Sequence, residues 1–216
     1  MIFDILETEQ YSSEIGKMIL NKIYDSSDEE LVKMRTKAHR LSHDYNNCYD
    51  DELEKRNEIL KQLLPHAGKD LYLQSPIQFD YGVFTRFGDR CYANFNFVVL
   101  DCASVFIGND VFFGPNCTLA TPIHPFLPSE RNMKTREDGS LFNLEYAKPI
   151  IIGSNCWIAS NVTICGGVTI GDNTIIGAGS VVTRDIPSDV LAVGNPCKVI
   201  RKLTEQDSIY LKQELF

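Results

Sequence analysis

Six consecutive hexapeptides near the C-terminus constrain this chain more than any other feature of its sequence. They run from Ile152 to Pro187 as I-G-S-N-C-W, I-A-S-N-V-T, I-C-G-G-V-T, I-G-D-N-T-I, I-G-A-G-S-V and V-T-R-D-I-P. Each begins with a β-branched aliphatic residue: Ile152, Ile158, Ile164, Ile170, Ile176 and Val182. A period of six without a gap indicates a repeat architecture, in which each unit buries its apolar side against its neighbours.

The period predicts a parallel β-helix. Each hexapeptide supplies one short strand and one corner, and alternation along the strand points the aliphatic side chain inward. Corners often need a positive φ, which Gly, Asn and Asp accept most readily. Such residues fall at the expected corners Ser154-Asn155, Gly166-Gly167 and Asp172-Asn173. Three hexapeptides make one triangular coil, so these six make two coils of a stack whose ends need caps.

The repeat extends upstream and is interrupted once. Pairs of an apolar residue and glycine recur at Tyr81-Gly82, Phe87-Gly88, Ile107-Gly108 and Phe113-Gly114. Leu119 is in step with them, but the next secure member is Ile152, so a loop of about 27 residues leaves the stack. We expect this excursion at about residues 124–149.

The first 68 residues predict a helical cap after a loosely attached leader, residues 1–12. Apolar spacing predicts a helix from Ser13 to Asp25 and another from Asp51 to Leu64. Between them, Ser27 followed by Glu30 resembles a capping box that opens a helix ending at Asn46-Asn47. The expected division is a cap (1–68), a β-helix domain (69–202) and a C-terminal helix or arm (203–216).

The amino-acid composition excludes some classes of binding partner. The net charge of −8 argues against a general nucleic-acid or membrane-surface binder, and no stretch reaches transmembrane length. The seven cysteines contain no C-x-x-C pair, and several fall at inward positions, which indicates free thiols in the cytoplasm.

Several further motifs follow the cap in order: Tyr92-Ala93-Asn94-Phe95-Asn96, His124-Pro125, Trp157-Ile158, Ile176-Gly177-Ala178-Gly179-Ser180 and Gly194-Asn195-Pro196. The cap and these motifs together resemble maltose and galactoside O-acetyltransferases, in which they occur in the same order. The resemblance covers about residues 14–205. It implies a left-handed β-helix, a homotrimer with active sites between adjacent subunits, and acetyl transfer from acetyl-CoA to a hydroxyl of a small sugar. It implies no metal.

His124 is the candidate general base, because transfer to a hydroxyl needs a group that accepts the hydroxyl proton near neutral pH. It is the only histidine beyond residue 66, and an ordinary loop histidine is the alternative reading. The resemblance places an oxyanion donor at the Ser160 backbone. It assigns acceptor binding to Asp25, Asp80, Tyr92, Asn94 and Asp101. It assigns acetyl-CoA binding to Gly114, Ser160, Ala178, Thr183, Lys198 and Arg201.

The sequence departs from the galactoside enzyme at several positions. That enzyme has two consecutive acidic residues where this chain has Asp101-Cys102, and a serine where this chain has Asp80, which puts galactoside specificity in doubt. It has arginine where Lys198 stands here. The loop after His124 is also about nine residues longer in this chain, and Glu145 and Tyr146 are candidates to return to the site.

Other readings stay open at this level. A cysteine nucleophile is disfavoured because most cysteines sit at core positions without a second histidine nearby. A zinc carbonic anhydrase needs three histidine ligands, whereas the repeat region holds one. An acetyltransferase for an antibiotic or oligosaccharide, or a non-catalytic binding module, remains an alternative. The acceptor sugar and the hydroxyl that is acetylated are not specified by the sequence.

Overall fold

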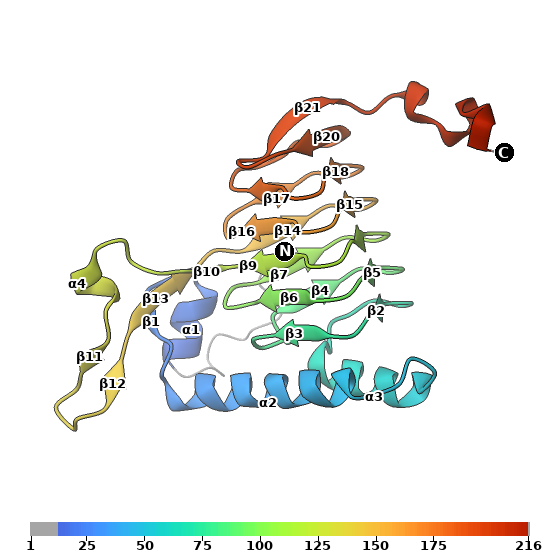
Figure 1. Cartoon of the computed structure of the whole chain (residues 1–216). Coiled ribbons are helices and arrows are strands. Elements are labelled where there is room, and N and C mark those ends of the chain that lie inside the picture. The colour runs from blue at the N-terminus through green and yellow to red at the C-terminus, as the bar shows by residue number, and fades with distance from the viewer. Residues whose placement is uncertain (1–12, 216) are drawn as a thin grey trace.

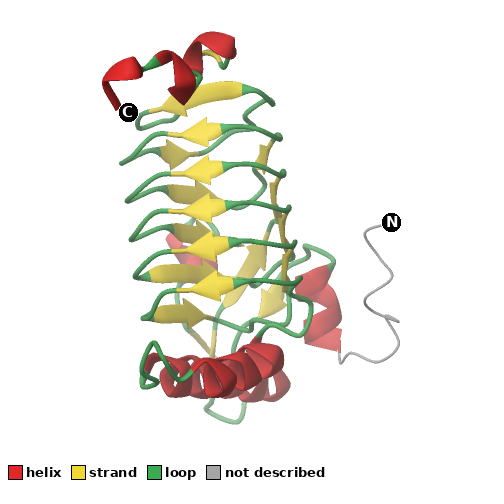
Figure 2. Ribbon diagram, turned by 90° about the vertical axis from the view of Figure 1, so that its right-hand side faces the viewer, coloured by secondary structure: helices red, strands yellow, loops and turns green. Residues whose placement is uncertain are grey.

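The chain folds into a triangular prism of stacked coils, capped by helices at one end and extended by an arm at the other (Figure 1). The structure is a computed structural model that describes residues 13–215. It is mainly β, a left-handed parallel β-helix of about six turns. The hexapeptide period predicts the parallel β-helix, and the family resemblance predicts its left hand. Figure 2 shows the coils stacked edge-on above the cap.

Three parallel sheets form the faces of the prism. One contains β4 (Thr85–Phe87), β7 (Val105–Ile107), β14 (Ile150–Ile152) and β17 (Thr169–Ile170). The second contains β2 (Tyr72–Leu73), β5 (Tyr92–Ala93), β8 (Phe112–Phe113), β15 (Trp157–Ile158), β18 (Ile175–Ile176) and β20 (Val190–Val193). The third contains β3 (Ile77–Phe79), β6 (Phe97–Leu100), β9 (Thr118–Ala120), β16 (Thr163–Cys165) and β19 (Val181–Val182).

The interior consists of aliphatic and aromatic ladders. All six residues that open the hexapeptides are buried, and Ile107 pairs with Ile152 across the interruption, which keeps the stack in register. Corners with positive φ occur at Asn155, Asn173 and Gly167, as predicted. Their side-chain amides also stack: Asn155 donates to Asn173 Oδ1 at 3.0 Å. The period therefore fixes both the core and the corners.

Two of the three helices of the cap lie where the sequence predicts them. α2 (Glu29–Asn46) buries Leu31, Ala38 and Tyr45, and α3 (Leu53–Leu63) follows it. The N-cap of α2 is Asp28, which accepts from the backbone of Glu30 and Leu31, so the expected capping box at Ser27 is wrong.

The first predicted helix is too long. α1 (Ser13–Ile19) ends early because Asn21 adopts a positive φ, and β1 (Tyr24–Asp25) instead pairs with the excursion loop. The expected leader, residues 1–12, lies outside the described residues.

The excursion has structure of its own. It contains β10 (Pro122–Ile123), α4 (Pro128–Arg131), the hairpin β11 (Lys134–Thr135) and β12 (Leu141–Phe142), and β13 (Leu144–Ala147). β13 is the central strand of an antiparallel sheet between β1 and β10. A strand of the cap is thereby joined to the loop that carries His124.

The C-terminal tail is an arm rather than an amphipathic helix. β21 (Lys198–Lys202) returns antiparallel along β20, and three short 3-10 turns follow: η1 (Glu205–Asp207), η2 (Ile209–Leu211) and η3 (Gln213–Leu215). The arm projects away from the prism (Figure 1). Within residues 13–215, no helix is long and apolar enough to cross a membrane.

Candidate active site

The predicted site residues gather on two different edges of the prism. We call the corners that follow β3, β6, β9, β16 and β19 the histidine edge, because the excursion with His124 leaves there. We call the corners that follow β5, β8, β15 and β18 the asparagine edge, after Asn94. Since one face of the prism separates these edges, a single chain does not bring the two groups together.

On the histidine edge, His124 follows β10 directly and its side chain is half exposed. Its Nδ1 lies 3.5 Å from Oε2 of Glu145, a residue of β13 with only a tenth of its side chain exposed. The other oxygen of Glu145, Oε1, accepts from the Tyr24 hydroxyl at 2.5 Å. A carboxylate at Nδ1 leaves Nε2 of the ring to face a substrate.

Two further acids lie at this edge. Asp25, beside Tyr24 in β1, accepts from Ser27 and is paired with Arg136 of the β11–β12 turn. Asp80 Oδ1 lies 3.6 Å from His39 Nε2, and Cys102 Sγ lies 3.5 Å from Asp80 Oδ2. The structure thus places Asp25 and Asp80 on the edge that carries His124, each beside a basic side chain.

Asp101 does not face this region. It is fully buried, and its carboxylate accepts from the Tyr81 backbone at 2.8 Å and from Thr85 Oγ1 at 3.0 Å. Burial raises the pKa of Asp101 to about 6 against an ordinary value of 3.8. Within the chain, Asp101 ties two coils together. Its acceptor contact stays a prediction, and its burial argues against that role.

On the asparagine edge, small residues follow one another up the stack. The backbone N–H of Asn94 donates to the carbonyl of Phe113, the residue before Gly114. A Cβ on Gly114 would lie 2.7 Å from the Ser160 backbone nitrogen. Ala178 is exposed one coil above Ser160. The small side chains of Gly114, Ser160 and Ala178 leave the backbone accessible to an extended ligand.

The sheet beside this edge presents aromatic side chains outward. Tyr72 and Tyr92 stack with ring centroids 6.1 Å apart, and Phe112 and Trp157 continue the column. The side chains of Phe112 and Trp157 are each about half exposed. Tyr92 is therefore part of an apolar outer face.

The remaining predicted residues are placed separately. Thr183 is exposed just after β19, on the histidine edge. Lys198 and Arg201 lie on exposed β21. Arg201 already forms a two-point ion pair with Asp207, which lowers its availability to a phosphate.

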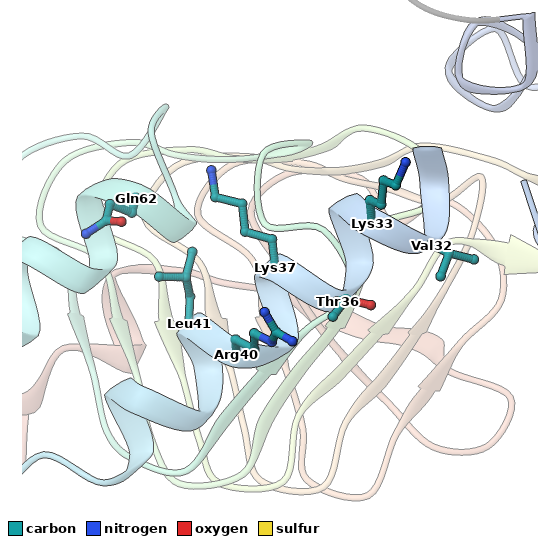
Figure 3. Close-up of a pocket in the computed structure, with 7 residues that line it drawn as sticks. All are labelled: Val32, Lys33, Thr36, Lys37, Arg40, Leu41 and Gln62. Carbon is teal, nitrogen blue, oxygen red and sulfur yellow. The ribbon is translucent and has the colours of Figure 1, made fainter. Parts of the chain in front are cut away.

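A separate cavity of about 500 Å³ lies on the cap, between α2 and α3 (Figure 3). Val32, Lys37, Arg40, Leu41 and Gln62 are among its lining residues. It includes no predicted site residue. Across residues 13–215, no group of three or more His, Cys, Asp or Glu side chains could hold a metal ion.

The arrangement suits proton transfer better than covalent catalysis. All seven cysteines are unpaired, and burial raises the pKa of six of them, Cys102 and Cys117 included, so the reactive thiolate is disfavoured. A histidine backed by a carboxylate, in contrast, is a familiar general base.

Sequence reasoning singled out Glu145 only as a candidate and missed Tyr24 and Arg136. Tyr24 and Glu145 are 121 residues apart, and no periodicity marks either of them. The one sequence signal was that Glu145 stands where the excursion returns to the repeat.

Comparisons with known proteins agree with this architecture. The family profile described as a maltose acetyltransferase hexapeptide capping motif matches residues 17–68, and a bacterial transferase hexapeptide profile matches residues 149–184. The galactoside O-acetyltransferase of Escherichia coli K12 is 39% identical, covering 88% of this chain and 89% of its own.

Two solved structures are also similar. A maltose O-acetyltransferase from Clostridium difficile 630 matches with a TM-score of 0.82 and 42% identity, over 90% of this chain and 99% of that one. A galactoside acetyltransferase in complex with coenzyme A matches with a TM-score of 0.82 and 36% identity, over 91% and 94% of the two chains. The chain therefore belongs to the maltose and galactoside O-acetyltransferase family of hexapeptide-repeat proteins.

Proposed function

We propose that this protein transfers the acetyl group of acetyl-CoA to a hydroxyl of a small sugar, with His124 as the general base. The observation that carries the proposal is the contact between His124 Nδ1 and Glu145 Oε2 at the root of the excursion loop. Relatives named as maltose and galactoside O-acetyltransferases, one of them with coenzyme A bound, support this reaction class.

In the proposed mechanism, His124 Nε2 takes the acceptor hydroxyl proton while the hydroxyl oxygen attacks the thioester carbonyl. Glu145 stabilises the imidazolium that forms, because an opposite charge nearby favours the protonated ring. The backbone N–H of Ser160 donates to the oxyanion. As the carbon–sulfur bond breaks, His124 returns the proton to the departing thiolate, so no acyl-enzyme forms.

The other predicted site residues bind the acceptor or acetyl-CoA. Asp25, Asp80, Tyr92 and Asn94 bind the acceptor. Carboxylates and amides suit sugar hydroxyls, and the carboxylates of Asp25 and Asp80 lie next to Arg136 and His39 respectively. For acetyl-CoA, the small residues Gly114, Ser160 and Ala178 of one copy fit an extended arm, and Thr183 lies on the histidine edge of the copy that faces them.

Lys198 and Arg201 serve the nucleotide end of acetyl-CoA. The unpaired cysteines favour a cytoplasmic enzyme.

We propose further that the site forms between copies of the chain in a homotrimer. His124 and Asn94 lie on different edges of one prism, so they meet only if the histidine edge of one copy faces the asparagine edge of another. The exposed aromatic face with Phe112 and Trp157 borders the asparagine edge, and an apolar patch of this kind is typical of a contact surface.

The first test measures thiol release from acetyl-CoA with a panel of glucosyl and galactosyl acceptors. We expect turnover with at least one sugar, and a loss of roughly a hundredfold or more in His124→Ala, the usual scale for a lost general base. Undiminished turnover in the variant would remove His124 from the mechanism. No turnover and no stabilisation by acetyl-CoA would favour a binding module.

Subunit mixing tests the shared site. His124→Ala damages the histidine edge, and Ala178→Trp fills the asparagine edge, so each variant alone is expected to have low activity. Refolding the two together creates interfaces in which both facing edges are intact, and part of the activity returns. Activity that stays at the level of the separate variants would contradict a site between copies.

A further inference from the structure

We propose that Tyr24, in the helical cap, is a positioning residue for His124 that acts through Glu145. This inference rests on the proposed function, because it concerns the histidine assigned as the base. Tyr24 reaches no reacting atom itself. It fixes one oxygen of the carboxylate so that the other is presented to the imidazole.

The geometry supports a relay of three side chains from three segments. Tyr24 lies in β1, Glu145 in β13 and His124 directly after β10, and these strands are neighbours in one antiparallel sheet. Tyr24 is directly opposite Glu145 in the β1–β13 register, and Ile123 is opposite Tyr146 in the β10–β13 register. The register of the paired strands therefore places the three side chains next to one another.

The two oxygens of Glu145 have different partners. Oε1 accepts from the Tyr24 hydroxyl at 2.5 Å, and Oε2 lies 3.5 Å from His124 Nδ1. Tyr24 is 1% exposed and Glu145 is 8% exposed. A hydrogen bond from a buried neutral donor to a buried carboxylate is among the stronger kinds, and it restricts the rotation of the carboxylate.

Tyr24 acts as a donor throughout the working pH range. Burial is the main reason that its pKa is raised above the ordinary value, and Cys102 and Glu145 raise it further. Cys102 also interacts with Asp80, Asp101 and Arg35 of α2, and Glu145 also lies beside His124. The Tyr24 hydroxyl is thus held neutral beside a carboxylate.

The same short strand also secures the excursion loop. Asp25 follows Tyr24 and pairs with Arg136, whose guanidinium stacks 4.7 Å from the Phe142 ring. Two adjacent residues of the cap therefore hold the loop at two points, one at the carboxylate behind His124 and one at the β11–β12 hairpin. Through Tyr24, the cap contributes to the chemistry as well as to the end of the prism.

The test follows the titration of His124 by NMR in histidine-labelled protein, with His124→Gln used to assign its signal. Tyr24→Phe, Glu145→Gln and the double variant are compared with the wild type. If Tyr24 acts through Glu145, Tyr24→Phe changes the His124 titration in the same direction as Glu145→Gln does. The double variant then behaves as Glu145→Gln alone, because the effects of residues that act through one another are not additive.

Tyr45→Phe is the matched control. Tyr45 is also a buried tyrosine of the cap, and its hydroxyl donates to the Leu73 carbonyl at 2.6 Å. It belongs to a different buried cluster from Tyr24. We expect it to lower stability as Tyr24→Phe does while leaving the His124 titration unchanged. A similar shift in Tyr45→Phe would identify a general effect of cap stability and would overturn the proposal.

Kinetics supply the second readout. Tyr24→Phe is expected to lower kcat by about tenfold, the scale of one hydrogen bond to a charged group, with little change in KM for the acceptor. An unchanged His124 titration in Tyr24→Phe, or a double variant well below Glu145→Gln, overturns the relay. The NMR arm needs no acceptor, so the relay is tested even if the panel of sugars shows no turnover.

Discussion

Replacing Asp101 by asparagine removes one buried titratable group and leaves its shape almost unchanged. Asp101 is 0% exposed and joins the Tyr81 backbone to Thr85. Burial raises its pKa to about 6, whereas the ordinary value is 3.8. The folded protein therefore holds the Asp101 proton more tightly than the unfolded chain does, and this group favours folding more as the pH falls.

The size of the effect on folding stability follows from the pKa of Asp101 in the folded and in the unfolded state. At pH 7 the carboxylate is ionised in both states, and the difference of about two pKa units costs the folded state on the order of 3 kcal/mol. At pH 5 the folded carboxyl is mostly protonated while the unfolded one is still mostly ionised. About 1.3 kcal/mol of the cost is relieved between pH 7 and pH 5.

The assay is chemical unfolding of the wild type and Asp101→Asn at pH 7 and pH 5, at one protein concentration. We expect the stability of the wild type relative to the variant to rise by about 1.3 kcal/mol as the pH falls, whatever their offset at pH 7. Asp138→Asn is the control. The pKa of Asp138 is lowered below 3.8, mainly by its hydrogen bond from Ser140, so its offset stays constant above pH 5.

The reasoning about burial would be refuted if the difference in unfolding free energy between the wild type and Asp101→Asn did not change between pH 7 and pH 5. It would also be refuted if the wild type lost stability relative to the variant as the pH falls. Acetyl transfer should persist in Asp101→Asn, since the side chain faces no acceptor. A loss of acceptor affinity with unchanged stability would restore it to the substrate site.

Three further predictions concern the scaffold, each checked by unfolding. Ile164→Ala, at a fully buried ladder position, should cost about 3 kcal/mol, whereas Phe126→Ala, at a site 88% exposed, should cost under about 0.5 kcal/mol. Arg56→Met should cost about 2 kcal/mol, because the buried guanidinium bonds to Tyr45, Leu73 and Asp50. Asn155→Ala should cost about 1 kcal/mol at a corner with φ of 59°, and Asn155→Gly should recover part of the loss.

The cap illustrates where local sequence signals succeed and fail. The helix predicted to end at Asn46-Asn47 is α2, and it turns Leu31, Ala38 and Tyr45 to the core, because a helix with one apolar side has a single way to face a core. The same reasoning extended α1 to Asp25, although the chain turns at Asn21 and forms β1. A two-residue strand has no periodicity of its own, and it exists only because β13 is there to pair with it.

The site shows the same division. His124 was singled out as a candidate because a lone histidine between two prolines stood at the root of the loop, and its role as the base stays a prediction. The burial of Asp101 was not predictable, because an acidic residue beside a predicted site looks the same in sequence whether it faces solvent or the core. Its burial depends on Tyr81 and Thr85 in the preceding coil, which the repeat alone does not specify.

The sequence by itself determined the prism, since a strict period of six forces side chains to alternate and coils to stack in one register. The composition of each hexapeptide also determined the ladders and the corners, because inward aliphatics and left-handed asparagines are local requirements. Only the tertiary structure decided that Tyr24 of the cap meets Glu145 of the loop. It also decided that His124 and Asn94 lie on different edges. Those relations depend on contacts between distant segments, whose register is set by packing and strand pairing rather than by any local pattern.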